Sequence, residues 1–119
     1  MNQAEHLPLD IELRGIEQSL PLALLQAREA AMAKFRPMLR AHDLTEQQWR
    51  VLRVLAAYPD VDASEIVARS YLLAPSLTRI LQFLETRNLI KRVADAADLR
   101  RAYFSLTDKG TRLYQKVSP

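Results

Sequence analysis

The chain has 119 residues and a net charge of +3, with 49% hydrophobic and 26% charged residues. Its length is that of one ordinary domain, and its composition is that of a folded globular chain rather than a disordered or fibrous one. The longest apolar run, residues 20–25, is far shorter than the roughly 18 residues needed to cross a bilayer. No secretory signal is visible, so we expect no membrane segment and a cytoplasmic location.

Residue counts exclude several classes of site. The chain has no cysteine, which excludes disulfides, thiolate zinc sites and cysteine nucleophiles. Only His6 and His42 offer imidazoles, and the two glycines, Gly15 and Gly110, cannot form a glycine-rich phosphate loop. No nucleophile with a base and no carboxylate pair stands at a recognisable catalytic spacing. We therefore predict that the protein is not an enzyme and has neither a metal nor a cofactor.

The charge is unevenly distributed along the chain. Residues 1–68 carry −3, residues 69–101 carry +4 and residues 102–119 carry +2. A basic stretch after an acidic one is the footprint expected of a nucleic-acid-binding face, although a solvated surface with chance clustering gives the same count.

The first half of the chain predicts an extended arm followed by helices. Apolar and polar residues alternate over residues 1–18, the pattern of an extended segment, and the helical period begins at Ser19 and continues to about Ala41. Thr45 and Gln48 form a capping box, which predicts a second helix from residue 46 to the proline at 59. Its expected buried side consists of Trp49, Leu52, Val54, Leu55 and Tyr58.

Two further helices follow at short spacing. Asp62 and Glu65 repeat the capping pattern and predict a third helix that ends near Ser70. Pro75 suits the first turn of a fourth helix. The core-facing stripe of this helix is expected at the i, i+3, i+4 and i+7 positions Leu77, Ile80, Leu81 and Leu84.

The last third of the chain predicts a hairpin and a final helix. Asn88 tolerates the left-handed conformation that ends a helix. Residues 89–93 and 102–106 have strand composition, and the basic connection 94–101 is too long for a tight turn. Thr107 caps a last helix that the end of the chain is expected to cut short.

Helices followed by a two-stranded hairpin form the winged helix-turn-helix arrangement, a mainly α fold with a small β component. We therefore predict an N-terminal arm, residues 1–18, and a winged helix-turn-helix domain, residues 19–119. In this fold one helix enters the major groove of DNA and the hairpin tip reaches the adjacent backbone or minor groove.

The side of the fourth helix opposite its core stripe carries small, polar and basic residues that can reach base edges. Among them we expect DNA contacts from Ser76, Thr78, Arg79 and Gln82, with Arg79 bidentate to guanine. Phosphate contacts without sequence readout are expected from Arg69, Lys91 and Arg92. The alternative is a winged-helix module that binds protein without reading DNA; apolar or acidic residues on this face would favour it, and Phe83 is the one such residue.

Three motifs between residues 44 and 110 resemble those of the MarR-type transcriptional regulators. They are Leu44-Thr45-x-x-Gln48-x-x-x-Leu52, Ser76-Leu77-Thr78-Arg79-x-Leu81-x-x-Leu84-Glu85, and Asp95-x-x-Asp98-x-Arg100-Arg101 followed by Leu106-Thr107-x-x-Gly110. Segments 24–32, 35–37 and 44–50 resemble the branch that represses homoprotocatechuate (hydroxyphenylacetate) degradation operons. This resemblance implies a homodimeric repressor that binds a pseudo-palindromic operator of roughly 20 base pairs and that an aromatic acid releases. The family usually has glycine where this chain has Asn88, and its C-terminal helices, which build the dimer, continue beyond this length.

The resemblance also implies roles in the loop and in an effector site. Asp98 is expected to form a salt bridge that orients a wing arginine toward DNA, with Arg100 as the paired arginine and Arg101 as the freer one. An aromatic carboxylate needs a cation for its charge and aromatic walls for its ring. The predicted effector ligands are Arg28, His42 and Trp49. The first helix and the shortened last helix are expected to contribute to dimerisation.

Overall fold

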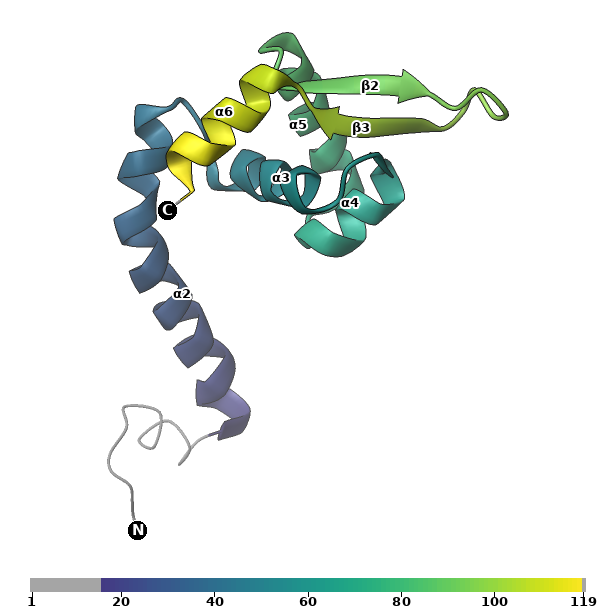
Figure 1. The fold of residues 1–119 in the computed structure, drawn as a ribbon. Coiled ribbons are helices and arrows are strands. Elements are labelled where there is room, and N and C mark those ends of the chain that lie inside the picture. Colours follow the sequence, from purple (N-terminus) through teal and green to yellow (C-terminus); the bar gives the residue numbers. More distant parts are fainter. Residues whose placement is uncertain (1–15, 119) are drawn as a thin grey trace. The chain divides into compact units, whose positions relative to one another are not determined.

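The computed structural model describes residues 16–118, with side chains from residue 19 onward (Figure 1). It divides into two compact units, residues 1–38 and residues 39–119, and each is described by itself. The predicted arm, residues 1–18, lies almost entirely outside the described residues. In chain order the elements are α2 (Ile16–Ala41), α3 (Glu46–Ala57), β1 (Val61–Asp62), α4 (Ala63–Ser70), α5 (Ala74–Thr86), β2 (Ile90–Ala94), β3 (Ala102–Leu106) and α6 (Asp108–Val117).

The first unit is formed by α2, which begins three residues before the predicted start at Ser19. Arg36 donates two hydrogen bonds to the Glu29 carboxylate, at 3.0 and 3.2 Å, across two turns of the helix. This pairing lowers the pKa of Glu29. Large apolar side chains stand exposed along the same helix, namely Leu22, Leu24, Leu25 and Met38.

Helices α3 and α4 begin where their capping boxes predict. The Thr45 hydroxyl accepts from the Gln48 backbone N–H at 3.1 Å while the Gln48 side chain accepts from the Thr45 N–H at 3.0 Å. Asp62 and Glu65 make the same reciprocal pair at the start of α4. Both caps satisfy N–H groups that a helix leaves without a partner, and both predictions are confirmed.

The buried side of α3 is Trp49, Val51, Leu52, Val54 and Leu55. The sequence prediction omitted Val51 and was wrong about Tyr58. That tyrosine follows the end of α3 and is 43% exposed, with the Arg69 guanidinium 3.7 Å above its ring centroid. The phenol therefore contributes a cation–π contact at the surface in place of core packing.

The sheet has three antiparallel strands in the order β1-β3-β2, one more than the predicted hairpin. Strands β2 and β3 pair from Ile90 opposite Leu106 to Ala94 opposite Ala102, and together with the loop 95–101 they form the wing that extends from the rest of the unit (Figure 1). The added strand β1 places Val61 opposite Phe104. Both of these side chains are buried, so β1 joins the base of the wing to the core.

Helix α6 packs against α3 and contributes to the core. Trp49 and Tyr114 stack with ring centroids 4.9 Å apart, and Val117 is buried. The Thr107 hydroxyl accepts from the Gly110 N–H at 3.0 Å and donates to the Asn88 carbonyl at 2.6 Å. The start of α6 is thereby fixed against the backbone that leads into β2.

Asn88 ends α5 with a φ of 61°, the left-handed conformation predicted for it. An Asn88→Ala variant should lose about 1 kcal/mol of unfolding free energy, because a side chain with a Cβ and no local hydrogen-bonding group is disfavoured there. Asn88→Gly should keep or slightly exceed the wild-type value. Urea unfolding of the two variants measures the difference, and an alanine variant as stable as the glycine variant would contradict this account.

Candidate nucleic-acid interface

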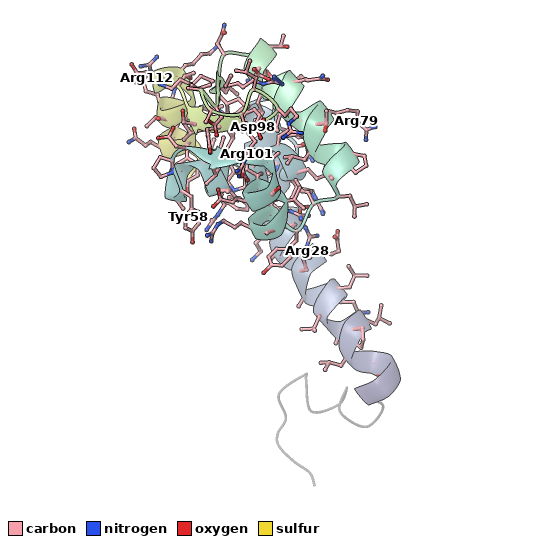
Figure 2. All side chains as sticks on the ribbon, turned by 90° about the vertical axis from the view of Figure 1, so that its right-hand side faces the viewer. Arg28, Tyr58, Arg79, Asp98, Arg101 and Arg112 are labelled. Atoms are coloured by element: carbon pink, nitrogen blue, oxygen red, sulfur yellow. The ribbon has the colours of Figure 1, made fainter. Side chains whose placement is uncertain are left out.

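The polar side of α5 faces solvent as predicted. Thr78, Arg79 and Gln82 are exposed and Ser76 is half-buried, while Leu77, Leu81 and Leu84 on the other side are buried. Figure 2 shows the Arg79 side chain extending outward from α5 at the edge of the molecule. The Thr78 hydroxyl lies 3.4 Å from the Ala74 carbonyl of its own helix.

Phe83, the apolar residue on this side of α5, remains 42% exposed. The Arg87 guanidinium lies 5.7 Å from its ring centroid. The ring is therefore available at the surface beside a cation rather than packed into the core.

The wing loop is organised by two aspartates. Asp98 pairs with Arg100, whose Nε lies 3.1 Å from Oδ1, and also accepts from the Arg100 backbone N–H at 3.1 Å. Asp95 accepts from the Ala97 N–H at 2.8 Å and from the Tyr103 hydroxyl at 3.1 Å. These hydrogen bonds lower the pKa of both carboxyl groups. The loop is thus held in one shape by bonds formed within it and by one bond from Tyr103 of β3.

The expected pairing of Arg100 with Asp98 is present, but the expectation that Arg101 is the freer arginine is wrong. Arg101 pairs with Asp62 at the start of α4 and is 53% exposed, whereas the Arg100 side chain is 91% exposed. Arg100 therefore extends furthest into solvent, and Arg101 ties the wing to α4. The sequence signal for Asp62 was its capping box alone, which gives no indication of a partner 39 residues away.

A surface cavity of about 350 Å³ lies between the wing, α5 and the start of α4. It brings together five of the predicted DNA-contacting residues, Thr78, Gln82, Arg92, Arg100 and Arg101. Arg92 enters this set with its guanidinium 5.8 Å from the Phe104 ring centroid. Because neighbouring residues of a strand point to opposite faces, Lys91 does not line the same cavity. The groove is concave and carries three arginines against two carboxylates, Asp62 and Glu85, an excess of positive charge that suits a phosphate backbone.

Arg69 lies apart from this groove. It lines a different cavity, of about 680 Å³, formed by α3 and the end of α4 together with Arg50, Arg53 and Tyr58. Arg50 is held there by Glu46 at 3.1 Å and by the Ser70 carbonyl at 3.0 Å. A phosphate contact by Arg69 thus remains a prediction at a second surface.

Each of the three predicted effector residues has its own described surroundings. Trp49 is 3% exposed and stacked on Tyr114, and His42 lines a cavity of about 300 Å³ that Trp49 does not line. Arg28 belongs to the first unit, where it pairs with Glu29 at 3.2 Å. The cations that do surround His42 were not predicted: Arg87, Lys109, Arg112 and Lys116.

The Asp62 carboxylate accepts a hydrogen bond from the Glu65 N–H and pairs with Arg101, and both interactions lower its pKa below the ordinary 3.8. A carboxyl group with a depressed folded-state pKa stabilises the fold above its unfolded pKa, and this contribution is lost as pH falls through the folded value. Asp62→Asn keeps an oxygen for the cap but removes the charge. We therefore expect the free energy of unfolding of this variant to fall less steeply than that of the wild type below about pH 4.

Urea unfolding across the acid range measures this slope. Asp60→Asn is the matched control, because Asp60 is an exposed carboxylate two residues away with a φ of 59° that asparagine tolerates. Equal flattening of the pH dependence in both variants would show that the effect is one of general charge and not of the Asp62–Arg101 pair.

Within residues 16–118 no helix is long and apolar enough to span a membrane, and no group of three His, Asp or Glu residues is placed to hold a metal ion.

Comparison with known proteins gives a consistent result. Residues 42–101 match the profile of the MarR family. The chain is 48% identical over 102 residues to the homoprotocatechuate degradative operon repressor of Escherichia coli, an alignment that covers 86% of this chain and 69% of that protein. It also resembles the structure of NadR in complex with 4-hydroxyphenylacetate, with a TM-score of 0.75 and 36% identity over 98% of this chain and 75% of that one.

A third similarity concerns DNA directly. The transcriptional repressor CouR, in a structure bound to a 23-mer DNA duplex, matches with a TM-score of 0.77 and 29% identity, covering 86% of this chain and 72% of that one. The winged helix-turn-helix fold and the absence of enzymes among these relatives agree with the predictions from sequence. The chain belongs to the MarR family of transcriptional regulators.

Proposed function

We propose that this protein represses an operon for the degradation of an aromatic acid by binding its operator through α5 and the wing. The observation that carries the proposal is the basic groove between these two elements, lined by Thr78, Gln82, Arg92, Arg100 and Arg101. A helix with exposed polar residues beside a projecting basic hairpin is the geometry of a winged helix on DNA. The E. coli relative named as a degradative operon repressor supports the choice of target. Such a repressor acts in the cytoplasm, on the chromosome.

Each DNA-facing residue has a role in this proposal. Arg79 reads guanine in the major groove, with Ser76, Thr78 and Gln82 hydrogen-bonding to bases or phosphates around it. Arg100, held by Asp98, reaches into the minor groove, where cations are attracted by the phosphates on both sides. Lys91, Arg92 and Arg69 contact phosphates, as does Arg101 where its pairing with Asp62 allows.

We propose that the protein acts as a homodimer on a pseudo-palindromic site. The exposed apolar residues of α2, Leu22, Leu24, Leu25 and Met38, support this, because exposed apolar side chains of this size are stabilised by burial against another chain. The proposed domain organisation, an arm over residues 1–18 and a winged domain over residues 19–119, assigns α2 and α6 to that interface. Two recognition helices about one helical turn apart then require half-sites at that spacing.

The proposed effector is a small aromatic carboxylate, with Arg28, His42 and Trp49 as its predicted ligands. The NadR structure, described as a complex with 4-hydroxyphenylacetate, supports this class of ligand. An effector that binds the DNA-free conformation more tightly shifts the population away from the operator-bound one.

Fluorescence anisotropy of a labelled duplex from the promoter beside the protein's own gene tests this function. Adding 4-hydroxyphenylacetate should weaken binding at least about tenfold, the lower range of allosteric coupling. The neutral alcohol 4-hydroxyphenylethanol, which lacks the carboxylate, should leave binding unchanged. Operator binding that neither compound alters would refute the proposed effector class and leave the DNA-binding proposal standing.

A further inference from the structure

The cavity around His42 is a cluster of cations on a surface that the proposed DNA contacts do not use. It measures about 300 Å³, at the lower end of the range for small-molecule sites. Its lining consists of His42, Arg87, Leu89, Lys109, Arg112, Leu113 and Lys116. No aspartate or glutamate is among these described residues, so four permanent positive charges converge without a carboxylate between them.

Two of the cations are held in place by neutral backbone groups. Arg87 donates to the carbonyls of Asp43 at 2.8 Å and His42 at 3.2 Å, and Lys109 donates to the Arg87 carbonyl at 3.0 Å. Carbonyl partners fix the positions of these side chains without cancelling their charge. Both side chains lie near the C-terminal end of a helix, where positive charge is favoured, so their positions also stabilise the helices.

Arg112 and Lys116 have no such structural role. They stand one turn apart on α6, both are exposed, and neither forms an ion pair with a described residue. An i, i+4 pair of like charges costs a helix a few tenths of a kcal/mol. A ligand with negative charge relieves this repulsion and fills the space between the two side chains.

The cavity lies away from the DNA-reading surface. Figure 2 shows Arg112 and Arg79 on opposite sides of the molecule, with Asp98 and Arg101 of the wing between them. DNA held by Arg79 and the wing therefore leaves the cavity open. Leu89 and Leu113 add an apolar wall, which favours a ligand with a short hydrocarbon body.

We propose that this cavity binds a small organic dianion, a phosphate monoester or a dicarboxylate, with Arg112 and Lys116 as its principal ligands. A monocarboxylate leaves most of the positive charge uncompensated, so two negative charges are the better match. The bound dianion contacts side chains from the end of α5 and from α6. The cavity includes His42, one of the predicted effector ligands, but its principal ligands, Arg112 and Lys116, are not among them, and the proposal does not rest on the promoter target.

Isothermal titration calorimetry on the full chain without DNA tests the proposal, with phenyl phosphate as probe at about pH 7.5, where a phosphate monoester carries close to two negative charges. Arg112→Gln and Lys116→Gln should each weaken binding roughly tenfold, the effect of losing one charge-assisted hydrogen bond. The control Lys34→Gln removes the same charge from an exposed position on α2 and should change binding less than about twofold. Circular dichroism checks that each variant folds.

Three other probes show which class of anion the cavity prefers. Phthalate should bind comparably to phenyl phosphate if any dianion suffices, and inorganic phosphate should bind more weakly because it lacks the apolar body. Butyrate, a monoanion without an aromatic ring, should bind at least about tenfold more weakly than either dianion. Equal affinity for butyrate, no binding of phenyl phosphate, or equal weakening by Lys34→Gln would each overturn the proposal.

Discussion

An Arg79→Ala variant should bind its operator about 5- to 150-fold more weakly while its affinity for scrambled DNA changes far less. This range corresponds to the 1–3 kcal/mol that one bidentate arginine–guanine pair contributes to base discrimination. The structure supports the role because Arg79 extends outward from α5 beside the wing (Figure 2). Arg79→Lys should recover the phosphate attraction but not the discrimination, since an ammonium group cannot make the two parallel hydrogen bonds.

Lys91→Ala is the matched comparison. Lys91 is exposed on β2 and does not line the groove beside α5, so its loss should weaken binding to operator and to scrambled DNA by the same factor. The dependence of log affinity on log salt concentration should also become shallower by about one. Equal losses on the two duplexes for both the Arg79 and the Lys91 variants would contradict the division between base reading and phosphate contact.

A Gly110→Ala variant should lose about 2 kcal/mol of unfolding free energy. A Cβ at this position would stand 2.0 Å from the Leu89 carbonyl oxygen, so the backbone itself has to move. Overpacking of this kind typically costs 1–3 kcal/mol and more where no flexible side chain can yield, against roughly 1 kcal/mol that alanine gains over glycine inside a helix. The steric term outweighs the propensity gain.

Thr111→Ala provides the control for helix propensity, because Thr111 is the next residue of α6 and is exposed. It should be neutral or slightly stabilising. Chemical denaturation with equal m-values compares the two variants. A Gly110→Ala protein as stable as Thr111→Ala would show that the start of α6 can move away from Leu89, contrary to the close backbone contact described above.

Local signals in the sequence predicted most of the elements. The capping boxes at Thr45 and Asp62 and the left-handed Asn88 each depend on neighbours within a few residues, and all three are present as predicted. Such features are readable because the hydrogen-bond partner lies one turn away in the chain.

The errors arise where the partner is distant. Strand β1 has two residues, too few to show a period, and its existence depends on Phe104 some forty positions later. The Arg101 guanidinium was expected to be the freer of two neighbours because its partner, Asp62, belongs to another element. Tyr58 follows the apolar stripe of α3 but lies past its end, where the backbone has already left the helix.

The candidate site likewise has some residues that local sequence patterns predict and others that depend on distant parts of the chain. The exposed face of α5 could be predicted because helical periodicity assigns each residue to a side. The effector residues stay a prediction that rests on ligand chemistry alone, because an effector cavity assembles side chains from several elements and residue spacing does not show which elements come together. The unpredicted cations around His42 come from the residue that follows α5 and from α6, which the wing separates along the chain.

In the proposed function, α5 and the wing read a particular DNA sequence. The most direct test is the ratio of dissociation constants for scrambled and promoter duplexes, measured by anisotropy at two salt concentrations. We expect a ratio on the order of a thousand or more, with both affinities falling as salt rises. Equal affinity for the two duplexes at both salt concentrations would contradict sequence-specific binding and favour a winged helix that docks on protein.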